Sequence, residues 1–445
     1  MENHWGQTAH MLCIKRQQNA RYRTKWFMNH FVLRLICSIF ATMKSLRELY
    51  KIGKGPSSSH TMGPQKAAQI FAAQNEGAIS FSVTLYGSLA ATGKGHMTDV
   101  AIEEVLSPLA PTTIVWEPTK FLPFHPNGMT FNAIHANGRP NTSWTVYSVG
   151  GGTLSEGDHP TGVLPPSPDI YPLSHLSDIK KWCYDNGRAY WEYVNEHEDS
   201  GIWDYLQEIW EAMKRSVERG IEQEGRLPGP LNLQRKAFTY YVKAQGYRRN
   251  LQTRGLVYSY ALAVSEENAS GGTIVTAPTC GSCGVMPGVL YHLAKGHEFS
   301  DIKILHALAT GGLVGNIVKQ NASISGADVG CQGEVGVACA MASAAACQIF
   351  GGSPAQIEYA AEMGLEHHLG MTCDPICGLV QIPCIERNAF AATRALDSNL
   401  YATFSDGKHR VSFDRVVQVM KQTGHDLPSL YKETSEGGLA AQLLV

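Results

Sequence analysis

The chain has 445 residues, with 37 lysines and arginines, 39 aspartates and glutamates and a formal charge of -2. This length allows two or three domains with buried cores. The balanced charge lacks the basic excess of nucleic-acid-binding proteins, so no nucleic acid is expected as a partner. Eleven cysteines in a long chain without an evident disulfide pattern indicate a reducing compartment, and we expect a cytoplasmic protein.

Residues 1–42 differ in composition from the rest of the chain. They carry six lysines and arginines and a single acid, Glu2. The apolar stretch FVLRLICSIFATM is interrupted by Arg34 and is too short to span a membrane, so no membrane partner is expected. We expect a non-native or disordered leader, with translation beginning at Met43. The alternative is a targeting peptide, since a basic start followed by an apolar stretch is also typical of one.

The next part of the chain has the pattern of strands. Period-2 alternation with β-branched and aromatic residues appears in ISFSVTLYG, TTIVWEP, MTFNAIHAN and TSWTVYSVG, between residues 79 and 150. This predicts a strand-rich N-terminal domain over 43–150. Residues 151–176 contain five prolines and several glycines, which predict a linker or a long loop.

From residue 177 onward the apolar spacing becomes helical. The stretches SDIKKWCYDNGRAYWEYVNEHE and IWDYLQEIWEAMKRSVERGIEQ place apolar residues on one face and charges on the other. Residues 333–350 are nearly all small or apolar, which predicts a central, closely packed helix. An all-helical domain over 177–445 is expected. Its further helices are predicted at 232–263, 284–295, 301–319, 333–350, 354–369, 378–397 and 412–423.

A dense polar run, PSSSHTMGP, occupies residues 56–64. Serine hydroxyls and backbone N–H groups suit a carboxylate or a phosphate, and His60 could move a proton. The alternative is that these residues only cap the helix that follows. Nearby motifs add further polar side chains, each of which is individually more often structural than catalytic: Lys94, His96, Asp99, His125 and Asn127.

Three cysteines lie close together in MTCDPICGLVQIPC, at residues 373, 377 and 384. Their spacing fits neither a zinc ribbon nor a thioredoxin-like C-x2-C. Cys331 precedes the small-residue helix, where free N–H groups and the helix dipole favour a thiolate. Cys331, Cys373 and Cys384 could therefore converge. The main competitor for a metal is the C-x2-C pair Cys280 and Cys283.

Six motifs together resemble the bacterial iron–sulfur L-serine dehydratases of the single-chain type. They are GPSSSHTMGP, TGKGHMTD, YSVGGG, TAPTCGSCGV, NASISGADVGCQGEVG and EHHLGMTCDPICGLVQIPCIERN. The resemblance covers about residues 43 to 445. It implies an α+β N-terminal domain of the allosteric substrate-binding type followed by an all-α catalytic domain.

The resemblance also implies a reaction, the elimination of water from L-serine to give pyruvate and ammonia. It implies a [4Fe–4S] cluster with one open iron, held by Cys331, Cys373 and Cys384, and no pyridoxal phosphate. His60 is then expected as the base and His125 as a second acid or base. A homodimer is expected. The residues expected to bind substrate are Ser57, Ser58, Ser59, Thr61, Asn127 and Gly128.

The chain departs from that family in three places. Cys280 and Cys283 stand in a motif that usually reads Asn-Gly-Ala-Ala, and Cys377 stands where glycine is usual. The chain also lacks the C-terminal cysteine of some relatives. None of these cysteines is therefore expected to be a required ligand.

Two other functions remain open from the residues. One is a pyridoxal-phosphate-dependent serine or threonine lyase, with Gly150–Gly152 as a phosphate loop and Lys94 or Lys319 as the Schiff-base lysine. The other is an amino-acid-binding regulatory protein with a structural metal site. Neither explains three cysteines flanked by proline and helix-start signals as well as a cluster does.

Overall fold

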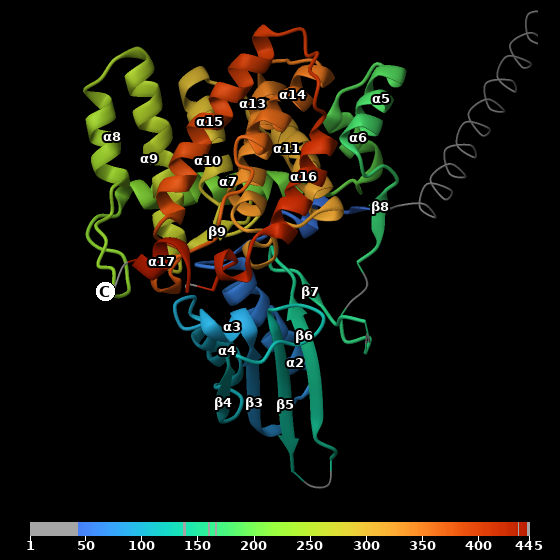
Figure 1. Cartoon of the computed structure of the whole chain (residues 1–445), viewed down its shortest axis with the longest axis vertical. Helices are drawn as coiled ribbons and strands as arrows, with labels where there is room; N and C mark the ends of the chain where they lie inside the picture. Colours follow the sequence, from blue (N-terminus) through green and yellow to red (C-terminus); the bar gives the residue numbers. More distant parts are fainter. Residues whose placement is uncertain (1–42, 137–138, 159–160, 165–166, 435, 443–445) are drawn as a thin grey trace, which may run out of the picture.

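A computed structural model describes the whole chain except residues 1–42, 137–138, 159–160, 165–166, 435 and 443–445. A small sheet with its helices forms much of the N-terminal part, and the C-terminal part is mostly helical (Figure 1). The predicted leader lies outside the described residues. Among the described residues, no helix has both the length and the apolar character needed to cross a bilayer.

The sheet has the strand order β4-β3-β5-β6-β7, in which only the β3–β4 pair is parallel. Its strands confirm the alternation read from the sequence, since Phe81, Val83 and Leu85 of β3 all point into the core. Phe71 of α2 stacks on Trp144 and covers one face. The elements are α2 (Gly63–Gln74), β3 (Ala78–Tyr86), α3 (Gly87–Ala91), α4 (Thr98–Leu106), β4 (Thr112–Glu117), β5 (Gly128–His135), β6 (Thr142–Ser148) and β7 (Leu154–Ser155).

The helical part is built around α13, in which every residue except Gln348 is buried. The predicted central helix is confirmed. Small residues allow the helices α13 and α14 to approach each other closely, since a Cβ on Gly364 of α14 would lie 2.9 Å from the Cα of Ala340 of α13. The helices are α5 (Leu176–Asn186), α6 (Tyr190–His197), α7 (Ile202–Glu222), α8 (Ala237–Gln245), α9 (Arg249–Ala269), α10 (Val285–His297), α11 (Asp301–Asn321), α12 (Gly326–Val329), η3 (Gln332–Gly336), α13 (Val337–Ile349), α14 (Pro354–Glu366), η4 (Ile376–Gly378), α15 (Cys384–Phe404), α16 (Phe413–Asp426), η5 (Ser429–Tyr431) and α17 (Gly438–Gln442).

Some helix boundaries differ from the expected ones. The predicted helix 232–263 is two helices, α8 and α9, and the one predicted from 378 begins only at Cys384. Pro383 precedes that start, and the region before it is an irregular loop in which Cys377 has a positive φ of 56°. The stretch from 177 to 198 is interrupted at Gly187, whose φ of 63° ends α5.

The first described segment packs with the helices and not with the sheet. Met43, Leu46, Leu49 and Tyr50 are fully buried in the large helical core. This segment contains β1 (Met43–Lys44), η1 (Leu46–Glu48) and β2 (Ile52–Lys54), and its strands pair with β8 (Asp169–Tyr171) and β9 (Thr273–Val275). The helical part is therefore completed by chain from before the sheet, and it contains a short strand where only helices were expected.

Candidate active site

Most of the sequence-predicted site residues gather where the sheet part meets the helical part. Contacts are close there, since a Cβ on Gly95 would lie 2.9 Å from the carbonyl oxygen of Gly378. Ser88 at the start of α3 donates to the backbone oxygen of Glu433, 3.3 Å away. In Figure 1 the C-terminal segment with α17 lies beside α3, although the two are far apart in sequence.

The SSSHT segment forms η2 (Ser58–Met62), which leads directly into α2. Ser57 caps it by accepting from the N–H of His60 at 3.1 Å, so the capping interpretation holds for this serine. Thr61 accepts from the N–H of Ser57 and donates to the backbone oxygen of His96, 2.6 Å away. Ser59 has a different role, because its hydroxyl lies 2.9 Å from Nδ1 of His60.

His60 is fully buried. Its Nε2 lies 3.2 Å from the carbonyl oxygen of Ser88, which can only accept, so Nε2 carries the hydrogen and the unprotonated Nδ1 accepts from the Ser59 hydroxyl. Burial lowers the pKa of His60 to about 4, although the Ser88 hydrogen bond acts against this. The imidazole is therefore neutral near pH 7 and can accept a proton at Nδ1.

Glu433 faces the same nitrogen. Its Oε1 lies 3.7 Å from Nδ1 of His60, and its backbone N–H donates to the carbonyl oxygen of Cys373 at 2.8 Å. Burial, reinforced by Cys331, raises the pKa of Glu433 to about 8. Since the pKa of His60 is depressed and that of Glu433 is raised, the pair is neutral near pH 7 and is not an ion pair.

Two of the three expected cysteines, Cys331 and Cys373, lie close together. Cys331 is the N-cap of η3, Cys384 is the first residue of α15, and Cys373 lies in the loop after α14. The sulfurs of Cys331 and Cys373 and one oxygen of Glu334 lie within 4.8 Å of one another. Cys331 and Cys373 donate to Glu334 Oε2 at 3.7 and 4.0 Å.

Arg387 links the third cysteine to the other two. Burial alone would lower the pKa of Arg387, but the neighbouring acids raise it. These acids are Cys331, Cys384, Asp374 and Cys373. Burial and the neighbouring Cys331 raise the pKa of Cys384, and the hydrogen bond with Cys331 and burial raise that of Cys373. Without a metal these two thiols are protonated, and a metal would have to displace the protons.

Cys331, Cys373 and Glu334 form a group that could hold a metal ion, and Cys331 also acts electrostatically on the buried Cys384. All three thiols are buried, two start helices and one guanidinium offsets their charge. Glu334 is a further buried acid, whose pKa burial and Glu433 raise to about 8. Cys377 is exposed and thus differs from the three, whereas Cys280 and Cys283 are buried.

His125, Asn127 and Gly128 lie at the start of β5. Nδ1 of His125 accepts from the N–H of Asn127 at 3.1 Å, and burial lowers the pKa of His125. His125 in turn contributes to lowering the pKa of His60, so the two imidazoles are near each other. Oδ1 of Asn127 is buried and has no hydrogen-bond partner among the described residues.

The glycine loop and a buried lysine also meet. Gly150, Gly151 and Gly152 all have positive φ, and the Thr153 hydroxyl accepts from Lys319 at 3.0 Å. Burial lowers the pKa of Lys319 to about 7. Lys94 instead lies 5.8 Å from the ring centre of Trp116. The lysine and the glycine loop thus form an internal contact between the two parts of the molecule.

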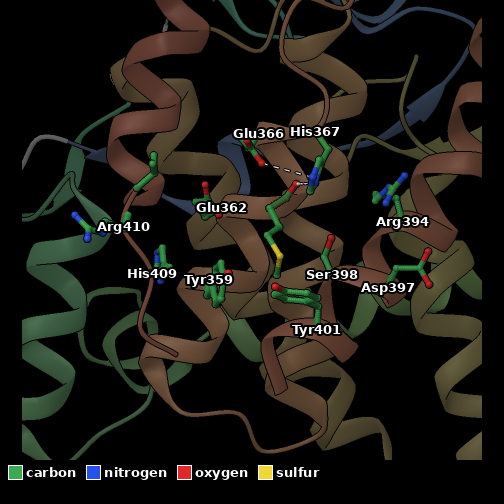
Figure 2. A pocket seen from close by; sticks show the side chains of 12 residues that line it. Tyr359, Glu362, Glu366, His367, Arg394, Asp397, Ser398, Tyr401, His409 and Arg410 are labelled. Atoms are coloured by element: carbon green, nitrogen blue, oxygen red, sulfur yellow. Dashed lines mark hydrogen bonds and ion pairs between the residues drawn. The ribbon is translucent and has the colours of Figure 1, made fainter. Parts of the chain in front are cut away.

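A separate cavity of about 450 Å³ lies between α14 and α15. Figure 2 shows the side chains of Glu362, Ser398 and Tyr401 around it. Burial, with Glu366 and Glu358, raises the pKa of Glu362 to about 7. None of the predicted site residues lines this cavity.

Sequence reasoning missed several members of the site. Glu334 stands three residues after Cys331 inside a motif already singled out, and His96 lies in TGKGHMTD, so both had a signal. Arg387 follows Cys384 by three residues, which places it on the same helix turn. Glu433 had no signal, because the segment around it contains no cluster of chemically active residues.

A family model and individual known proteins point to the same family. The family model described as "Serine dehydratase alpha chain" matches residues 68–440. The L-serine dehydratase of Streptomyces coelicolor is 40% identical over 451 residues, covering 90% of this chain and 99% of that protein. The L-serine dehydratase of Haemophilus influenzae is 39% identical, covering 90% of this chain and 100% of that protein. L-serine dehydratase 2 of Escherichia coli is 38% identical, covering 90% of this chain and 99% of that protein.

Proposed function

The chain belongs to the serine dehydratase alpha chain family, and from this premise we propose that it is an L-serine ammonia-lyase. It removes water from L-serine, and the resulting aminoacrylate hydrolyses to pyruvate and ammonia. The observation that carries this function is the identity of 38% to 40% with three L-serine dehydratases over 90% of the chain.

We propose that Cys331, Cys373 and Cys384 hold a [4Fe–4S] cluster and that no pyridoxal phosphate takes part. The burial of all three thiols, the close approach of Cys331 and Cys373, and the effect of all three on the pKa of Arg387 support this assignment. A bound cluster with three protein ligands supplies an open iron, which is a Lewis acid for the departing hydroxyl group. The exposed position of Cys377 supports leaving it out of the ligand set.

His60 takes the α-proton at Nδ1 in this proposal. The hydrogen bond of Nε2 to Ser88 orients the ring, and burial keeps it neutral and able to accept. His125 is assigned as a second acid or base from the family resemblance, and it also contributes to the lowered pKa of His60. The segment Ser57 to Thr61 shapes the substrate site, with Ser58 and Ser59 as hydroxyl partners. Asn127 offers its unpaired Oδ1, and Gly128 follows it at the start of β5.

The finer organisation is also part of the proposal. The N-terminal sheet is assigned to the allosteric substrate-binding type, and the enzyme is expected to be a cytoplasmic homodimer. These statements rest on the family resemblance. The helical part carries the cysteines, and the sheet part carries His60, so catalysis needs both parts in contact.

Anaerobic purification followed by iron and sulfide analysis and a pyruvate assay tests this function. We expect about four irons and four sulfides per chain and pyruvate formation from L-serine. A protein that holds the cluster but forms no pyruvate would contradict the activity. A Schiff-base absorbance band that shifts when an amine is added would favour the pyridoxal-phosphate lyase instead.

A further inference from the structure

Three buried side chains form a compact group beside the proposed cluster ligands. One nitrogen of His60, one nitrogen of His96 and one carboxyl oxygen of Glu433 lie within 4.8 Å of one another. The two imidazole rings are 4.5 Å apart between centroids. The residues come from η2, from the loop before α4 and from the segment after η5, so the tertiary fold alone brings them together.

His96 has no role in the proposed chemistry so far. Its side chain is fully buried, and neither ring nitrogen has a hydrogen-bond partner among the described residues. Each unpaired buried polar atom costs about 1–3 kcal/mol. The backbone at His96 is held firmly, because its carbonyl oxygen accepts from Thr61 at 2.6 Å. A ring so placed, with both nitrogens unused, points to a ligand that the free protein lacks.

The size of the group suits an ammonium nitrogen. Because the three atoms all lie within 4.8 Å of one another, a nitrogen placed among them can lie within about 2.8 Å of each, which is a hydrogen-bond distance. An ammonium group has three N–H donors, while a neutral imidazole and a carboxyl group each offer an acceptor.

We propose that Glu433 and His96 bind the α-ammonium group of the amino-acid substrate and thereby select amino acids over hydroxy acids. This rests on the proposed function, because it takes L-serine as the substrate. The α-carbon is one bond from the ammonium nitrogen. Binding that nitrogen at Glu433 and His96 brings the α-hydrogen toward Nδ1 of His60, the unprotonated nitrogen of that ring, which accepts it in place of the Ser59 hydroxyl hydrogen.

The test compares two ligands of the cluster-loaded enzyme by calorimetry. L-alanine and L-lactate share a carbon skeleton and differ in carrying an ammonium or a hydroxyl group, and neither has a β-leaving group. We expect wild type to prefer L-alanine. Glu433→Gln should reduce the preference about 10- to 100-fold and His96→Asn about 3- to 10-fold, as expected for losing hydrogen bonds to a charged group. In parallel, KM for L-serine should rise more than kcat falls.

His135→Asn is the matched control. His135 is also a buried imidazole of the sheet part with one unpaired nitrogen, and it lies at the opposite end of β5 from Gly128. The variant His135→Asn should leave the preference for L-alanine over L-lactate unchanged. An unchanged preference in both Glu433→Gln and His96→Asn overturns the proposal. A zinc ion retained by wild type and lost in His96→Asn, without a changed preference, would assign the group to metal binding.

The ligand preference is read without turnover, so it separates this inference from the function. A preference that falls in the variants of a protein that forms no pyruvate would leave the ammonium site standing and overturn the activity. Pyruvate formation by an enzyme whose variants keep the ligand preference would leave the activity standing and overturn the ammonium site.

Discussion

Glu433 places its carboxyl oxygen 3.7 Å from Nδ1 of His60, so the last part of the chain meets the first polar motif. Glu433 also pairs through its backbone with Cys373. The base proposed for catalysis and one of the proposed cluster ligands are thus connected through one residue. Each prediction below concerns this arrangement or the core that supports it.

His60→Ala is expected to lower kcat by about 10²–10⁴, because proton abstraction from the α-carbon is lost. The iron–sulfur absorbance should remain, since His60 is not among the proposed ligands. Steady-state kinetics and a visible spectrum of the same sample check both parts. Near-normal turnover would transfer the base role to His125 or another group.

Alanine at Cys331, Cys373 or Cys384 is expected to abolish both the absorbance and the activity. The same change at Cys377 should keep both, because this side chain is exposed whereas the three expected ligands are buried. Iron analysis and pyruvate assays on the four variants test the assignment. Loss of the cluster from Cys377→Ala but not from Cys384→Ala would show that the ligand set is wrong.

Gly326→Ala is expected to impair cluster binding without changing a ligand. A Cβ at this position would lie 2.8 Å from Oε2 of Glu334 and 3.0 Å from the sulfur of Cys373. Gly246→Ala is the control, since its nearest neighbour would be 3.4 Å away. We expect at least about half of the iron to be lost in the first variant, because buried sites do not absorb such contacts without displacement. Equal iron content in the two variants would contradict this.

Air exposure is expected to inactivate the enzyme, and ferrous iron with a reductant should restore it. The reason is that an iron without a protein ligand is the one most easily oxidised and released. Activity is followed against time in air and after reconstitution, with an anaerobic sample as control. Activity that survives both prolonged air and a strong chelator would exclude the cluster.

His292→Gln is expected to make stability less sensitive to acid. Burial lowers the pKa of His292 to about 4 from an ordinary value of 6.5, so the unfolded chain binds the proton more readily. Stability from this group is present above about pH 6.5 and declines as the pH falls toward 4. Between about pH 7 and 5.5 the variant should lose about 1 kcal/mol less unfolding free energy than wild type.

Urea unfolding at both pH values measures this difference. The exposed His425→Gln serves as the control and should behave like wild type. A variant at His292 that loses as much stability as wild type would show that the imidazole does not titrate as its burial requires.

The sequence by itself determined the local elements and much of the chemistry. Alternating residues such as Phe81, Val83 and Leu85 specify a strand with one buried face, and the small residues of α13 specify a central helix. These patterns depend on periods of two and of about 3.6 residues, which neighbouring positions alone encode. Cys331 was recognisable for the same reason, since a helix start is a local feature, whereas the helix that begins at Cys384 was expected to start at residue 378.

Only the tertiary structure decided which distant residues meet. Glu433 lies in an unremarked segment, and His96 stands in a recognised motif but had no predicted role. Both join His60 because the C-terminal segment pairs with Cys373 beside the sheet part. Met43 and Tyr50 belong to the helical core although they precede the sheet. Contacts of this kind depend on burial and complementary packing between segments far apart in the chain, and no local period records them.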